Sequence, residues 1–333
     1  MSVALIIIIF LIVGIGFLFY FLLKKIIIPH RAFKAANYKN RNNTLKAIRT
    51  AKAAIEKNPQ NAEAHYLLGK AYLVDKREEQ ALREYKSASR LGITGINIPE
   101  SEFRETIAVL YAKFNEPEEA LKEYVILIKT HPENPEYYFQ AGLLFTLRGK
   151  NDLAEKYLRK AVSLNSQDSN YHFELGMLFY LSKRTKDAGL EFETALRLDP
   201  MGGKILLYMG KVHKDLKEYT KAIPYLEKAA RDQNYKLPAL VELGSCYMSL
   251  KMVDNAIHEL ERATSIITNE SEPDSLYARY FLAMCHEKNR DFAKAITQWD
   301  KIYTQKKNFR DVGEKLTQYI EYRTELHEKS ASK

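Results

Sequence analysis

The chain has 333 residues, and its 51 Lys and Arg against 42 Asp and Glu give a formal net charge of +9. The whole excess lies in residues 24–57, which hold ten basic residues and one acid and leave 41 basic and 41 acidic residues elsewhere. Because this charge is concentrated beside an apolar amino terminus, it does not indicate nucleic-acid binding. HExxH, P-loop and CxxC spacings are absent, so we expect no catalytic residues, no metal site and no cofactor.

The amino terminus carries a long apolar segment. Residues 3–23 are uncharged, and 17 of them are Val, Ile, Leu or Phe. A helix of this length spans about 31 Å, which matches the hydrocarbon core of a bilayer. A cleaved signal peptide is disfavoured because only Met1 and Ser2 precede the apolar run. We therefore predict a transmembrane helix over residues 3–27.

Basic residues follow the apolar segment directly. A polybasic segment on the carboxyl side of an anchor predicts that this side faces the cytoplasm. Its first members are expected to bind lipid headgroups: Lys24, Lys25, Arg31 and Lys34. The same charge is expected to hold the region that follows against anionic headgroups. The prediction is a single-pass protein of the inner (cell) membrane with its remaining residues in the cytoplasm.

A period of 34 residues runs through the rest of the chain. Its clearest marker is an alanine that recurs at separations of 34 or 39: Ala47, Ala81, Ala120, Ala154, Ala188, Ala222, Ala256 and Ala295. Twelve residues before each alanine stands Gly or Ala, nine before stands a ring, and four after stands a larger apolar residue in seven of the eight cases. These offsets are helical, and a 34-residue period is typical of helix–turn–helix repeats.

In the best-matched unit, Gly176, Phe179, Ala188, Phe192, Ala195 and Pro200 carry a pattern that resembles the tetratricopeptide repeat (TPR) family. The resemblance implies an all-α superhelical solenoid of about eight helix–turn–helix repeats, between the transmembrane helix and a carboxyl-terminal capping helix. The family's tryptophan slot is filled by other residues: His65, Arg104, Tyr138, His172, Leu206, Leu240 and Arg279.

The period gives the expected domain bounds. A degenerate, basic juxtamembrane repeat is predicted over 28–61. Seven further repeats are predicted over 62–95, 101–134, 135–168, 169–202, 203–236, 237–270 and 276–309, and the capping helix over 310–329. The two longer intervals place lengthened loops near 92–99 and 267–274. Cys246 and Cys285 fall at equivalent positions, too far apart for a disulfide, and are expected to be reduced core residues.

In TPR proteins a stripe of each first helix lines the groove that binds partners, and the resemblance transfers that stripe to this chain. The expected partner-binding residues are Phe139, Leu143, Phe173, Met177, Tyr180, Lys204, Lys211 and Lys214. An apolar centre beside a basic patch suits an amphipathic helix or an extended acidic–hydrophobic segment. The alternative for any one of these rings is packing against the neighbouring repeat.

Two function classes remain open from the sequence, and a third possibility is that the chain is a targeting fragment of a longer enzyme. The favoured one is a membrane-tethered TPR scaffold or adaptor that recruits or regulates protein partners. The alternative is a structural or assembly subunit of an envelope machine, such as a flagellar or pilus-associated assembly, on the periplasmic side. Neither the partner's identity nor the oligomeric state is encoded in a recognisable motif.

Overall fold

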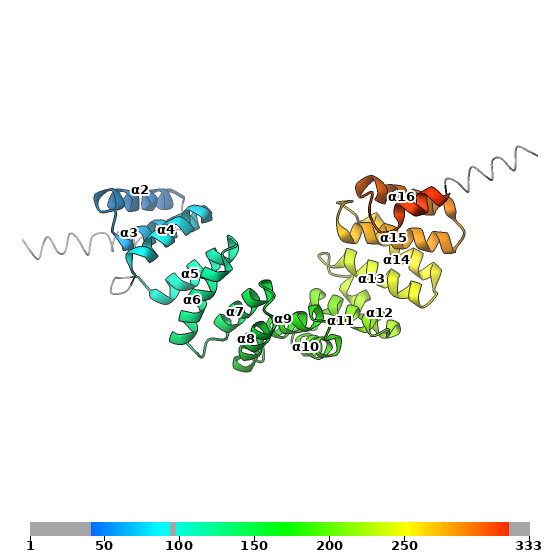
Figure 1. Cartoon of the computed structure of the whole chain (residues 1–333), viewed down its shortest axis with the longest axis horizontal. Coiled ribbons are helices and arrows are strands. Elements are labelled where there is room, and N and C mark those ends of the chain that lie inside the picture. Colours follow the sequence, from blue (N-terminus) through cyan, green and yellow to red (C-terminus); the bar gives the residue numbers. More distant parts are fainter. Residues whose placement is uncertain (1–40, 94–97, 320–333) are drawn as a thin grey trace, which may run out of the picture. The chain divides into compact units, whose positions relative to one another are not determined.

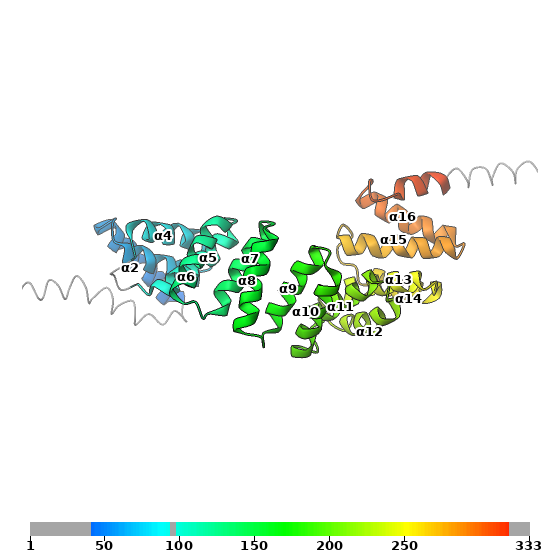
Figure 2. The same ribbon diagram turned by 60° about the horizontal axis from the view of Figure 1, so that its bottom comes forward.

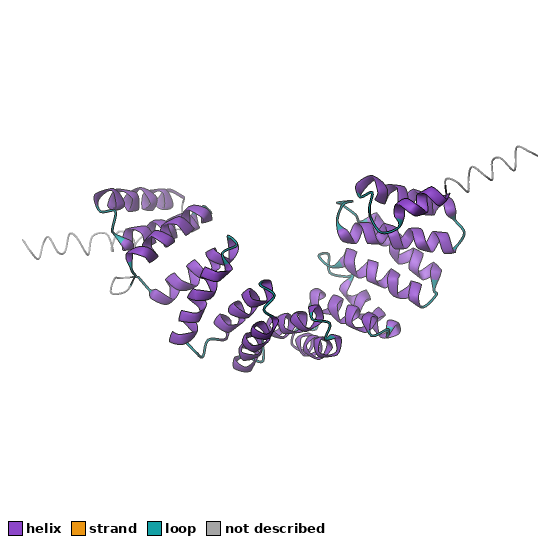
Figure 3. Ribbon diagram, viewed as in Figure 1, coloured by secondary structure: helices purple, strands orange, loops and turns teal. Residues whose placement is uncertain are grey.

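The structure is a computed structural model that describes residues 41–93 and 98–319, and all regular structure within these ranges is helical (Figures 1 and 3). The chain divides into two compact units, of which the first ends at Leu144 and the second begins at Phe145. The predicted all-α repeat fold is confirmed for the described residues.

Each repeat consists of a first and a second helix, and the two kinds alternate along the chain. The first helices of the repeats are α3 (Ala62–Val74), α5 (Glu100–Lys113), α7 (Pro135–Leu147), α9 (Ser169–Leu181), α11 (Gly203–Asp215), α13 (Lys236–Ser249) and α15 (Pro273–Lys288). The second helices are α2 (Arg41–Lys57), α4 (Glu78–Leu91), α6 (Pro117–Thr130), α8 (Asn151–Leu164), α10 (Thr185–Leu198), α12 (Tyr219–Ala229), α14 (Val253–Ser265) and α16 (Phe292–Gln305). Residues 312–319 are also helical. Consecutive helices from α2 to α6 and from α8 to α16 pack side by side, as α9 and α10 do (Figure 2).

The register read from the alanines is confirmed by burial. From Ala81 to Ala295, all seven repeat alanines have no exposed surface. Residues four positions later fill the space between the paired helices, and Phe192 and Trp299 are fully buried there. Glycine at the small position lets this side chain approach the opposite backbone. A Cβ on Gly69 would lie 2.6 Å from the ring of Tyr85.

Each turn between a first and a second helix contains one residue in the left-handed region. These residues are Lys76, Asn115, Gly149, Lys183, Lys217, Lys251 and Arg290. At Lys183, the amide of Arg184 donates to the carbonyl of Phe179 (2.9 Å) and the amide of Lys183 donates to Tyr180 (3.1 Å). This pair of bonds is the Schellman motif, which satisfies carbonyls that a helix end leaves open.

The lengthened loops carry side chains into the repeats. Ile93 and Ile98, on either side of residues 94–97, are both buried. In the second loop, Glu270 binds Arg279 of α15, with Oε2 2.6 Å from Nε. α15 begins at Pro273, ahead of the predicted repeat start at 276, because a proline is accommodated in the first turn of a helix.

Two predictions fall partly or wholly outside the described residues. The capping helix is present as far as residue 319, with Val312 buried against the last repeat, and the remainder to 329 is outside. The predicted transmembrane helix, 3–27, lies entirely outside. Within 41–93 and 98–319, no helix has the length and apolar character needed to cross a bilayer.

Candidate partner-binding surface

The predicted aromatic anchors are core residues. Phe173 on α9 is only 2% exposed, and its ring centroid lies 5.3 Å from that of Phe192 and 5.7 Å from that of Tyr208. Nζ of Lys204 lies 4.1 Å from the centre of the same ring. In the first unit, Phe139 is also buried. The expectation that these two rings are exposed for a partner is therefore wrong, because both are turned into the packing of the repeats.

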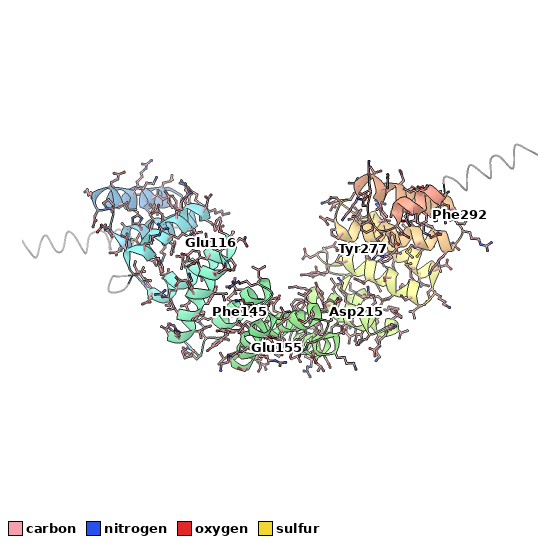
Figure 4. The ribbon with its side chains drawn as sticks, viewed as in Figure 1. Glu116, Phe145, Glu155, Asp215, Tyr277 and Phe292 are labelled. Carbon is pink, nitrogen blue, oxygen red and sulfur yellow. The ribbon has the colours of Figure 1, made fainter. Side chains whose placement is uncertain are left out.

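Met177 and Tyr180 on α9, and Leu143 on α7, are half-buried. The Tyr180 ring meets Tyr208 edge-on, with centroids 5.6 Å apart. Burial, together with a hydrogen bond to Asp215 at the end of α11 (labelled in Figure 4), raises the pKa of Tyr180. Tyr180 is therefore held in place by the next repeat while part of its surface stays open.

The most exposed apolar side chains on the first helices were missed by sequence reasoning. Leu147 at the end of α7 is 68% exposed, and Leu181 at the end of α9 is 64% exposed. Each leucine stands seven residues before a repeat alanine, Ala154 or Ala188, and this shared register was the available signal. We define the apolar surface of the second unit as Leu147, Met177, Tyr180 and Leu181.

The lysines of the predicted basic patch are paired with carboxylates within the chain. Lys204 pairs with Glu174 of the preceding first helix at 3.1 Å. Lys211 and Lys214 both pair with Glu242 of α13, the former at 3.5 Å. Burial disfavours the charged form of Lys214, but the charge of Glu242 outweighs it and raises the pKa of Lys214. These lysines are not the free cations that the sequence suggested.

Similar pairs join α3 to α5, and α15 to the turn and capping helix that follow the last repeat. Lys70 binds Glu102 at 2.5 Å in the first unit. In the second unit, Tyr280 donates to Asp311 at 2.8 Å, and Lys315 donates to Glu287 at 2.7 Å. The partners are 28–32 residues apart, a little under one repeat. The polar part of the stripe therefore fastens neighbouring repeats together.

Side chains in the tryptophan slot make a recurring bond within the repeat. When the slot holds His or Arg, that side chain bonds to a residue nineteen positions later on the second helix. His65 bonds to Glu84, His172 to Glu191, Arg104 to Glu123 and Arg279 to Gln298, at 2.6 to 2.8 Å. His65 and His172 are therefore bound inside their own repeats and have a structural role there.

Cys246 and Cys285 are free and buried, as predicted. Burial raises the pKa of Cys246 to about 12 and that of Cys285 to about 11, so neither forms a reactive thiolate near neutral pH. Among the described residues, no group of His, Cys, Asp and Glu is arranged to hold a metal ion. The predicted headgroup residues Lys24, Lys25, Arg31 and Lys34 lie outside the described part of the chain.

Helix pairs stacked in register, each contacting its neighbours, define a helix–turn–helix repeat protein. Two family models, both described as tetratricopeptide repeat, match residues 35–94, 106–169 and 148–203, and residues 204–231 and 237–269. These ranges span more than half of the chain, which therefore belongs to the tetratricopeptide repeat family. TPR proteins act as protein–protein interaction scaffolds, and this coarse function follows for the chain.

Solved structures share the fold. A TPR protein from Parabacteroides merdae is 15% identical, with a TM-score of 0.56 over 78% of this chain and 98% of that one. The C-terminal part of a TPR protein from Cytophaga hutchinsonii is 20% identical, with a TM-score of 0.51 over 85% and 99%. The APC/C hetero-tetramer Cut9–Hcn1 gives 16% identity and 0.56, over 83% of this chain and 52% of that one. A comparison of the chain with curated protein sequences found no match.

Proposed function

We propose that this chain is a membrane-tethered, non-catalytic scaffold that binds partner proteins on its first helices and recruits or regulates them at a membrane. The proposal is supported by the TPR repeats and by the uncharged residues 3–23, which are long enough to cross a bilayer. The apolar surface carries the binding part of the proposal.

Leu147 and Leu181 occupy equivalent positions in consecutive repeats and expose most of their side chains. Met177 and Tyr180 extend this surface along α9, and Tyr180 is held by Tyr208 and Asp215. Exposed apolar side chains beside a fixed aromatic ring suit the apolar face of an amphipathic helix or an extended hydrophobic segment. Because Lys204, Lys211 and Lys214 already have carboxylate partners, the apolar side chains supply most of the affinity.

A pair of double variants tests this assignment. Leu147→Asp/Leu181→Asp places charge on the apolar surface, whereas Leu190→Asp/Met201→Asp does so at equally exposed positions on and after α10. We expect the first variant to lose the partners captured by the wild type from detergent-solubilised membranes and the second to keep them. Both must melt like the wild type. Loss with the second variant alone would move the site to the second helices.

The membrane orientation is a separate part of the proposal. The basic residues after the apolar segment favour a cytoplasmic location for the repeats. Protease added to intact spheroplasts should then spare residues 30–333. Digestion without lysis would refute the cytoplasmic location and support the periplasmic envelope subunit instead.

A further inference from the structure

The outward face of α2 is a strip of positive charge. Lys46, Arg49, Lys52 and Lys57 are all exposed, and at 100° per residue they lie within an arc of roughly 140°. The opposite arc holds the buried side chains Thr44, Ala47, Ile48 and Ala51, which face the rest of the first unit. The buried side chains therefore fix the orientation of α2 about its own axis, and its basic face points to solvent.

These four cations differ from the others in the first unit. Lys86 lies 2.7 Å from Glu116, and Arg104 lies 2.6 Å from Glu123. Within residues 43–93 and 98–319, none of the four on α2 has a carboxylate within ion-pairing distance. The only acid on α2, Glu56, is exposed within the same arc, so the face has four cations against one acid and keeps a net positive charge.

We infer that the basic face of α2 docks on an anionic phospholipid surface. The inference deepens the proposed membrane tether by naming the surface that α2 meets. Lipid headgroups bind a spread of cations without a pocket, and each nearby Lys or Arg strengthens the attraction. A protein partner is disfavoured because the described part of this face has no aromatic side chain, the usual anchor of such an interface, and Leu45 is its one large apolar residue.

The sequence before α2 supports a lipid over a nucleic acid. Residues 24–39 add five cations, and the uncharged residues 3–23 precede them. The basic face therefore begins within a short length of chain from a segment suited to hydrocarbon. A nucleic acid would be expected to meet basic residues across the repeats as well, and there the charges balance.

The test uses the full chain with vesicles of phosphatidylcholine, with or without about 30% phosphatidylglycerol, to supply the anionic surface. Flotation with the neutral vesicles at high salt measures whether the chain is tethered to the membrane. Lysine acetylation, quantified by mass spectrometry, measures whether the lysines of the basic face are covered. We expect acetylation of Lys46, Lys52 and Lys57 to slow roughly tenfold or more with anionic vesicles only, and to recover in about 1 M salt, where screening is nearly complete.

Two matched variants sharpen the test. Lys46→Glu/Arg49→Glu/Lys52→Glu should restore fast acetylation of Lys57, and the neutral Gln version should restore it in part. Lys129→Glu/Lys160→Glu/Lys228→Glu changes the charge equally at exposed lysines of α6, α8 and α12 and should leave Lys57 protected.

Equal acetylation with both kinds of vesicle overturns the inference, even if the chain floats. Protection by duplex DNA but not by anionic vesicles, or protection that rises with protein concentration alone, overturns it in favour of nucleic acid or a second copy. A chain that does not float but is protected by anionic vesicles supports the inference and refutes the tether.

Discussion

The ring of Phe192 packs against the Cα of Gly176, in the space that a side chain at that position would occupy. A Cβ on Gly176 would lie 2.7 Å from both Cδ1 and Cε1 of the ring. The same relation joins Gly210 to Leu226 and Gly244 to Leu260. The close approach of the two helices in a repeat therefore depends on the absence of a side chain at one position.

Replacing Gly176 with Leu should lower the free energy of unfolding by about 1–3 kcal/mol or more, because neither backbone nor ring has room to retreat. Thermal and denaturant melts followed by circular dichroism measure it. Gly313→Ala is the control, since its Cβ would meet nothing closer than 3.7 Å and alanine favours a helix. An unchanged melt for Gly176→Leu would show that the helices are not in this register.

Lys217 is an exposed residue held at φ 61° in the turn between α11 and α12. Glycine adopts this conformation without a steric penalty, so Lys217→Gly should stabilise the protein by about 1 kcal/mol. Gly149 has φ 67° in the equivalent turn, so Gly149→Ala should lower the free energy of unfolding by a similar amount. Lys228→Gly inside α12 should instead destabilise. Destabilisation by Lys217→Gly would contradict the turn geometry.

Arg279 is buried and depends on Glu270 for its charge balance. Hydrogen bonds from Arg279 lower the pKa of Glu270, partly opposed by burial. A lowered folded-state pKa stabilises the protein above the unfolded value and ceases to do so as the pH falls through the folded value.

Glu270→Gln should therefore lower the free energy of unfolding by about 1–3 kcal/mol at pH 7. This is the range for a broken charged hydrogen bond at a site that water reaches. The difference from wild type should shrink below about pH 4, where the carboxylate becomes protonated. Urea unfolding across this pH range measures it, with Glu227→Gln as an exposed control. A difference that grows on acidification would refute the assignment.

Glu242 links two lysines of α11 to α13. A double-mutant cycle of Lys214→Met and Glu242→Gln should give a coupling energy of about 1–2 kcal/mol, because both side chains are shielded from water. The same cycle for Lys122 and Glu119, an exposed pair within α6, should give less than about 0.5 kcal/mol. Equal couplings would mean that Glu242 does not hold the repeats together.

The alanine period sufficed to predict the register. Ala188 and Phe192 are four residues apart, which is a helical spacing, and the same spacing recurs along the chain. It could not assign the face of Phe173. Helix α9 is apolar on nearly all sides, so the sequence does not distinguish the side facing α10 from the side facing solvent. Nor could it predict that Lys204 meets Glu174, because that pairing depends on the stagger between neighbouring first helices. Leu181 was missed for another reason, because its exposure follows from its place at the end of α9.

Site-specific photocrosslinking in the native cell shows directly whether partners bind the apolar surface. A photoreactive residue at 181 lies on the proposed surface, and one at 190 is equally exposed on α10. We expect a discrete crosslinked partner from position 181, lost in the Leu147→Asp background, and none from position 190. A partner crosslinked from position 190 and absent at 181 would contradict it.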